Sequence, residues 1–108
     1  MAFVVGENDK DRVGKLTELS SVGVDQTWQD VTASRAAAVT YTNSTGKPIE
    51  VVITKSGNGG HAVVVDGVTI GVPDDAAGLN YMVSFIVPNG STYSIATGAT
   101  VILWTELR

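Results

Sequence analysis

Hydrophobic and polar residues alternate in short runs along most of the chain, and clusters of Gly, Pro, Asn and Asp separate the runs. The runs are rich in Val, Ile, Thr and Tyr, which suit the half-buried surface of a β-sheet. The turn clusters recur about every 8–12 residues, a spacing that is typical of a sandwich or barrel. We therefore predict an all-β fold, an antiparallel β-sandwich of about seven or eight short strands that is either jelly-roll-like or immunoglobulin-like. The clearest strand runs are residues 61–65, 68–72, 81–87, 92–96 and 100–107.

One turn is predicted with particular sharpness. Asp66-Gly67 lies between two β-rich runs, and an Asp-Gly pair in that position favours a two-residue hairpin, because both central residues of a type I′ turn need a positive φ. From Gln26 onwards, Ala36-Ala37-Ala38 is the one patch that favours a helix, and the Thr and Tyr residues that follow it oppose one.

Charge is concentrated at the start of the chain, where seven of the first 18 residues are acidic or basic. We interpret residues 1–24 as a charged arm or linker, and residues 25–108 as one sandwich domain. Val13, Leu16 and Leu19 have a spacing compatible with a short amphipathic helix in the arm, which Gly14 weakens.

The composition narrows the classes of partner. Charged residues make up 17% of the chain, against about 25% in typical domains, so a surface partly covered by other copies is favoured over a monomer. The net charge of −4 and the scattered basic residues argue against nucleic acid. No run approaches the roughly 20 apolar residues of a membrane span, and the first residues lack the pattern of a secretory signal. Without cysteine there is neither a disulfide nor a Cys-ligated metal.

Residues suited to catalysis are sparse, so we predict a protein that is not an enzyme and has no cofactor or metal. His61 is the single histidine, and the sequence indicates no partner that would orient it as a base, so a structural or surface role is favoured. Asp74 and Asp75 are too few oxygen ligands for calcium, and their solvated loop is the simpler interpretation. No carboxylate pair can be identified for a glycosidase.

Four large side chains are predicted in the core or at an interface between subunits, three of them because aromatic groups dominate burial at such places. They are Trp28, Arg35, Phe85 and Trp104. Arg35 is one of few charges in its region, and two alternatives stay open for it: an inter-subunit salt bridge to Glu106 or Asp30, or a solvent-exposed side chain.

Four segments together resemble a known family. They are residues 26–36 (QTWQDVTASRA), 41–49 (YTNSTGKPI), 83–93 (VSFIVPNGSTY) and 104–108 (WTELR). In this combination and order they are similar to the tip domain that ends many tail-fibre and tail proteins of phages and prophages. The resemblance covers about residues 25–108, and residues 57–78 match only in strand character. It departs from the family in one respect, because such a domain normally ends a much longer chain.

The resemblance implies a homotrimeric β-sandwich at the distal end of a fibre, made in the host cytoplasm and carried on the virion. Its partners would be itself, other virion proteins and a bacterial surface glycan or protein. Loops are the expected contacts, since they vary on a rigid scaffold. The predicted binding residues are Gly57, Asn58, Gly59, Gly60, His61, Asp74, Asp75 and Asn80. The alternative is a capsid decoration or tail-assembly protein that has no host ligand.

Overall fold

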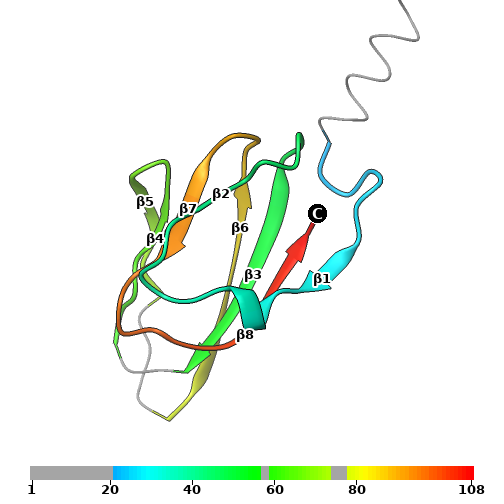
Figure 1. Cartoon of the computed structure of the whole chain (residues 1–108). Helices are drawn as coiled ribbons and strands as arrows, with labels where there is room; N and C mark the ends of the chain where they lie inside the picture. Colours follow the sequence, from blue (N-terminus) through cyan, green and yellow to red (C-terminus); the bar gives the residue numbers. More distant parts are fainter. Residues whose placement is uncertain (1–20, 57–58, 74–77) are drawn as a thin grey trace, which may run out of the picture.

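Two antiparallel four-stranded sheets pack face to face in the computed structural model, which describes residues 21–56, 59–73 and 78–108. The predicted all-β sandwich of about eight strands is confirmed (Figure 1). The elements are β1 (Trp28–Asp30), the 3-10 turn η1 (Thr32–Ser34), β2 (Tyr41–Thr42), β3 (Ile49–Ser56), β4 (Val63–Val65), β5 (Val68–Gly71), β6 (Asn80–Val87), β7 (Thr92–Ile95) and β8 (Thr100–Leu107). The helix predicted around Val13 and most of the arm lie outside the described residues.

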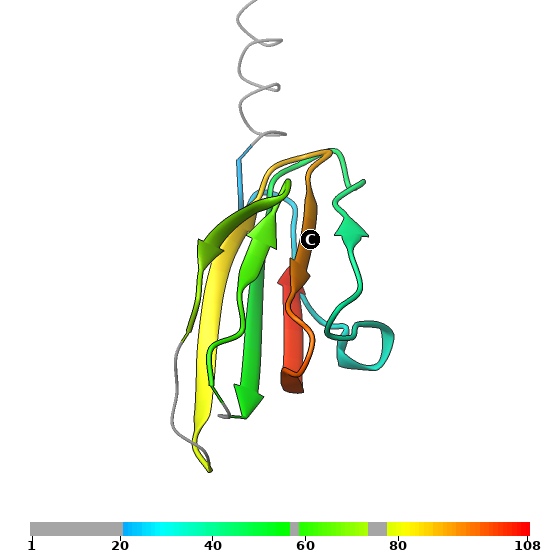
Figure 2. The same ribbon diagram turned by 90° about the vertical axis from the view of Figure 1, so that its left-hand side faces the viewer.

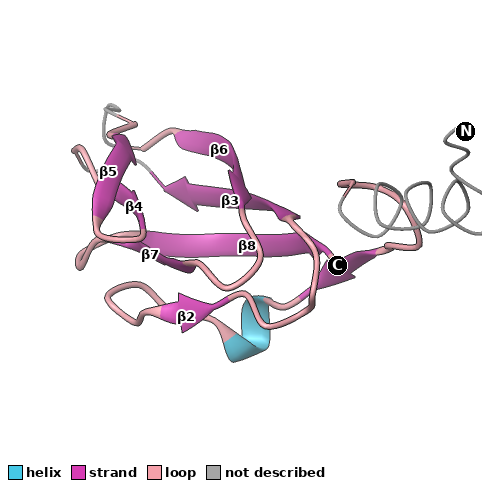
Figure 3. Cartoon of the chain, turned by 90° about the horizontal axis from the view of Figure 1, so that it is seen from above, coloured by secondary structure: helices cyan, strands magenta, loops and turns pink. Residues whose placement is uncertain are grey.

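The strand order is that of a jelly roll. Sheet A has the order β1-β8-β3-β6, and sheet B has the order β2-β7-β4-β5. The first strand therefore pairs with the eighth, the second with the seventh, the third with the sixth and the fourth with the fifth. The chain is a long two-stranded ribbon folded over on itself, and the sheets lie as two layers when seen from above (Figure 3). Antiparallel closure of this kind is one of the ways in which all-β domains limit their free edges.

The tip of the ribbon is the Asp66-Gly67 turn between β4 and β5. Both residues have a positive φ, 52° at Asp66 and 77° at Gly67, as the predicted hairpin requires. The Asp66 side chain also accepts hydrogen bonds from Ser91 Oγ at 2.6 Å and from the Thr92 backbone N–H at 3.0 Å. The turn is thus attached to the start of β7.

Alternation along the long strands builds the core between the sheets. Along β3 every second residue is buried, and the inward side chains are Ile49, Val51, Ile53 and Lys55. Each apolar side chain in such a position stabilises the fold by roughly 1.5–3 kcal/mol. The remaining core residues are Val63, Val65, Phe85, Val87, Tyr93, Ile95 and Trp104.

A buried asparagine joins the turn before β3 to the turn after β6. Asn43 Nδ2 donates to the carbonyls of Lys47 at 2.7 Å, Val87 at 3.0 Å and Pro88 at 3.2 Å. Its Oδ1 accepts from the Thr45 backbone N–H at 3.1 Å. The side chain therefore satisfies backbone groups that burial would otherwise leave unpaired.

The helical turn η1 lies just before the alanine patch, which itself is not helical. Asp30 Oδ1 accepts from the Thr32 backbone N–H at 3.0 Å and from Thr32 Oγ1 at 2.6 Å, and these bonds begin the turn. Asp30 is therefore engaged locally and is not the partner of Arg35 in the described structure.

Candidate functional site

The densest group of functional side chains lies inside the sandwich around Glu106, whose side chain is fully buried. Alternation along β8 places Glu106 and Trp104 on the inward face, two residues apart. Tyr93 reaches the carboxylate from β7 in the opposite sheet, and Arg35 reaches it from the segment that follows η1. Arg108 follows β8 directly. We call Arg35, Tyr93, Trp104, Glu106 and Arg108 the Glu106 cluster.

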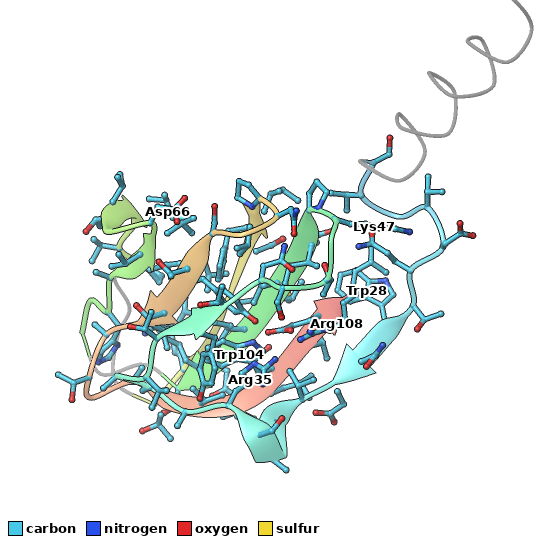
Figure 4. The ribbon with its side chains drawn as sticks, turned by 45° about the horizontal axis from the view of Figure 1, so that its top comes forward. Trp28, Arg35, Lys47, Asp66, Trp104 and Arg108 are labelled. Carbon is cyan, nitrogen blue, oxygen red and sulfur yellow. The ribbon has the colours of Figure 1, made fainter. Side chains whose placement is uncertain are left out.

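Five hydrogen bonds converge on the two carboxylate oxygens. Oε2 accepts from Tyr93 OH at 2.8 Å, Trp104 Nε1 at 2.9 Å and Arg35 Nε at 3.1 Å. Oε1 accepts from Arg108 Nη1 at 2.7 Å and Arg35 Nη2 at 3.1 Å. A carboxylate offers about four lone-pair positions, so its capacity to accept is filled. Figure 4 shows Arg35, Trp104 and Arg108 close together near β8, far from Asp66.

Aromatic rings surround this ion-pair cluster. Tyr41 packs edge-on against Trp104, with ring centroids 5.8 Å apart, and its ring lies 4.7 Å from the guanidinium carbon of Arg35. Tyr41 OH also accepts from the Ala36 backbone N–H at 2.8 Å, which fixes the loop that carries Arg35. Stacking on an aromatic face holds the planar guanidinium group of an arginine, and its N–H donors, in one orientation.

The electrostatics favour the ionised carboxylate. Burial raises the pKa of Glu106, but the hydrogen bonds from Arg35, Tyr93 and Trp104 and the charge of Arg35 outweigh it, so the pKa is lowered overall. Burial, followed by the hydrogen bond to Glu106, raises the pKa of Tyr93 to about 12. A filled, ionised carboxylate between two sheets is suited to holding the fold together and has no free position for a substrate.

The cluster answers one question that the sequence left open. Arg35 forms its salt bridge with Glu106 of the same chain, and its side chain is 14% exposed. The prediction of a pair with Glu106 therefore names the right residue, but the bond is within one subunit rather than between subunits. Phe85 and Trp104 are core residues. Trp28 on β1 is 54% exposed and therefore does not belong to the core, and its role at an interface stays a prediction.

A second buried polar pair lies elsewhere on the inner face of sheet A. Lys55 Nζ is 3.1 Å from His61 Nδ1 and donates to the Gly59 carbonyl at 3.4 Å. His61 was predicted as a surface-binding residue, but its side chain is only 7% exposed and is part of the packing beneath the loop.

The structure describes only some of the other predicted loop residues. Gly57, Asn58, Asp74 and Asp75 lie outside the described residues. Gly60 and Asn80 are exposed, and Gly59 is half-buried. Within the described ranges no three His, Asp or Glu side chains gather as metal ligands, and there is no helix with the length and apolar character needed to cross a membrane.

Sequence reasoning did not identify the outer face of sheet A. Across its strands Trp28, Leu107, Glu50 and Ile86 are successive partners, so one row is apolar except for Glu50. The most exposed apolar side chains on this face are Met82 at 69%, Trp28 at 54% and Ile86 at 48%. Apolar residues at outward positions of β6 were a signal in the sequence, since alternation there should have placed polar groups.

Comparison with known proteins found no match to any family model, curated protein or solved structure.

Proposed function

We propose that this protein is a non-enzymatic structural module of a tailed-phage virion, similar to a tail-fibre tip, that attaches the virion to the host surface as a homotrimer. One observation carries the proposal: the segments that resemble the tip domain pack together as a scaffold, and the exposed strand β5 lies outside those segments.

The resembling segments pack against one another. Residues 26–36 supply Arg35, residues 83–93 supply Tyr93, and residues 104–108 supply the remaining three members of the Glu106 cluster. The segment 41–49 contributes Tyr41, which packs on Trp104, and Asn43, which bonds the turn after β6. These sequences therefore encode the interior contacts of a scaffold.

The strand β5 differs in character from this scaffold, because its residues are largely exposed. The hairpin of β4 and β5 falls within residues 57–78, which match the family only in strand character. Val68, Ile70 and Val72 on this hairpin and its continuation are 61%, 49% and 55% exposed. A rigid scaffold that presents a variable, exposed loop region is the usual arrangement of a binding module. Three such sites on one trimer would raise avidity through effective concentration.

Whole-cell adsorption on a panel of bacterial strains, together with a glycan array, tests this proposal. We expect the wild-type protein to bind some strains or glycans, and V68S/I70S to lose that binding while its far-UV circular dichroism stays native. The matched control is V39S, which changes an apolar residue that is 43% exposed outside the hairpin. Equal binding by the wild type and V68S/I70S would overturn the assignment of the hairpin.

The outer face of sheet A favours a second candidate, a capsid decoration or tail-assembly protein. Exposed apolar patches mark protein interaction sites, and this face carries Met82, Trp28 and Ile86 at 69%, 54% and 48% exposure. Such a protein would bind purified virions or their structural proteins and no bacterial strain. That result in the same assay would replace host attachment with assembly.

A further inference from the structure

The sandwich has four edge strands, and three of them are protected. An edge strand exposes unpaired backbone N–H and C=O groups, and natural proteins guard such edges by short strands, charges, prolines or bulges. β1 has three residues and β2 has two. β5 has four residues, and its pairing with β4 is interrupted by a register shift between Val63 and Val64.

β6, the edge strand of sheet A beside β3, lacks all of these protections. It has eight residues, and each pairs in unbroken register with β3, from Asn80 opposite Ser56 to Val87 opposite Ile49. Its sequence, NYMVSFIV, contains no charged residue, proline or glycine. β6 and β5 lie along the same side of the sandwich (Figure 2). In the sheet order of the described residues β6 is thus an edge, and from Met82 to Val87 this edge is regular and uncharged.

We propose that β6 pairs antiparallel with β6 of a second copy, which joins two copies of sheet A into one eight-stranded sheet. A second copy fits this edge because the strand is uncharged. The chain has a net charge of −4, yet self-pairing here opposes no like charges. Two-fold symmetry makes such a contact self-complementary. If one residue of the first copy contacts a second residue of the other copy, the same contact occurs with the two copies exchanged.

Symmetry also restricts the register. A two-fold axis perpendicular to the sheet keeps outward side chains opposite outward ones, so paired residues must have the same parity. The register centred on Ser84 brings Met82 of each copy opposite Ile86 of the other. These are the two most exposed apolar side chains on the strand, at 69% and 48%. A register centred on Val83 would instead oppose Met82 and Ser84, and would leave both apolar side chains without an apolar partner.

This contact is separate from the proposed three-fold assembly. A trimer formed through other surfaces carries three β6 edges, which join two trimers when all three pair across a common three-fold axis, and a chain that forms no trimer would form a dimer through β6. A change that breaks the β6 contact therefore halves the mass of the assembly in either case.

The test is the solution mass of the full chain, measured by light scattering and sedimentation at concentrations up to about 1 mM, where weak contacts are populated. We expect M82K/I86K to halve the wild-type mass, because lysines of the two copies then face one another. M82K/I86E should restore it, because each new lysine faces a glutamate of the other copy. The control I102K/L103K adds the same charge at exposed positions of the interior strand β8, and it should keep the wild-type mass.

Equal masses for the wild type and M82K/I86K, both with native circular dichroism, would overturn the proposal, and so would an equal loss in I102K/L103K. Failure of M82K/I86E to restore the mass would overturn the register. If the lysine variant does not fold, amide hydrogen exchange of the wild type replaces it. The β6 backbone amides that point away from β3 should become more protected from exchange as the protein concentration rises. Exchange that does not depend on concentration would contradict the contact. The mass of the halved species tests the proposed trimer independently: three chains would support it, and a single chain would contradict it.

Discussion

Two buried charged side chains on the inner face of sheet A are held in contrasting ways. Glu106 on β8 is surrounded by two arginines, a tyrosine and a tryptophan, which come from both sheets and from the loop after η1. Two of the contacts that Lys55 on β3 makes are with a histidine nitrogen and a backbone carbonyl, both within six residues of it along the chain. The first arrangement ties distant parts of the sequence together, whereas these contacts of Lys55 are local.

The contrast indicates where stability is concentrated. Contacts between residues far apart in sequence hold the two layers of the sandwich in place, so their loss loosens the whole domain. Contacts within a few residues organise one loop. The contacts of Glu106 with both sheets and with the loop after η1 therefore make it a centre of the domain's stability.

The largest expected effect is that of Glu106→Gln. The change leaves Arg35 and Arg108 without their counter-charge, and breaking a buried pair costs about 3–5 kcal/mol. Because both arginines are partly exposed, at 14% and 25%, we expect a loss near the low end, about 3 kcal/mol of unfolding free energy in urea. Glu50→Gln on the outer face is the control. A loss below about 1 kcal/mol in E106Q, the range of a surface pair, would contradict this account.

Tyr93→Phe should have a smaller effect, about 2 kcal/mol, because it removes one hydrogen bond to a charged acceptor and keeps the ring. Tyr41→Phe is the matched control. It removes a bond between neutral groups, from the Ala36 N–H to the Tyr41 hydroxyl, so we expect about 1 kcal/mol. Thermal and urea unfolding of both variants gives the ranking, and a reversed order would argue against the central position of Glu106.

The smallest effect is a dependence on pH, visible only at the extremes. The lowered pKa of Glu106 means that its contribution is fully present above the ordinary glutamate pKa and is lost as pH falls through the folded value. The pKa of Tyr93 is raised from 10.0 to about 12, so its contribution is complete below pH 10 and is lost as pH rises towards 12. The difference in melting temperature between wild type and E106Q should be flat at neutral pH and shrink in acid. The difference between wild type and Y93F should shrink in alkali.

Much of the fold could be predicted from the sequence because the determining signals are local. The Asp66-Gly67 turn needs a positive φ at two adjacent residues, and the alternation along β3 is visible within the strand. The Glu106 cluster could be predicted only in part, because its members are separated by up to 73 residues along the chain, from Arg35 to Arg108. The spacing of Trp104 and Glu106 was the available signal, since two residues apart on a strand means one shared face.

The two tryptophans illustrate why residue type is not enough. Trp104 is fully buried because β8 lies inside sheet A, between β1 and β3, and this position faces sheet B. Trp28 belongs to the short edge strand β1, opposite the outward-facing Leu107, and more than half of its surface is exposed. The difference depends on strand order, which no local pattern encodes.

The nested pairing of the strands also governs the order of folding. The β4–β5 pair closes across two residues, the β3–β6 pair encloses it, and the β1–β8 pair joins Trp28 to Leu107 at the greatest separation. Loops that grow at each step make later pairings slower, so the hairpin at Asp66-Gly67 should form early and the Glu106 cluster late. Interactions absent from the transition state act mainly on the unfolding rate. The Glu106 cluster should therefore act as a kinetic lock, which lengthens the lifetime of the folded domain more than it speeds its formation.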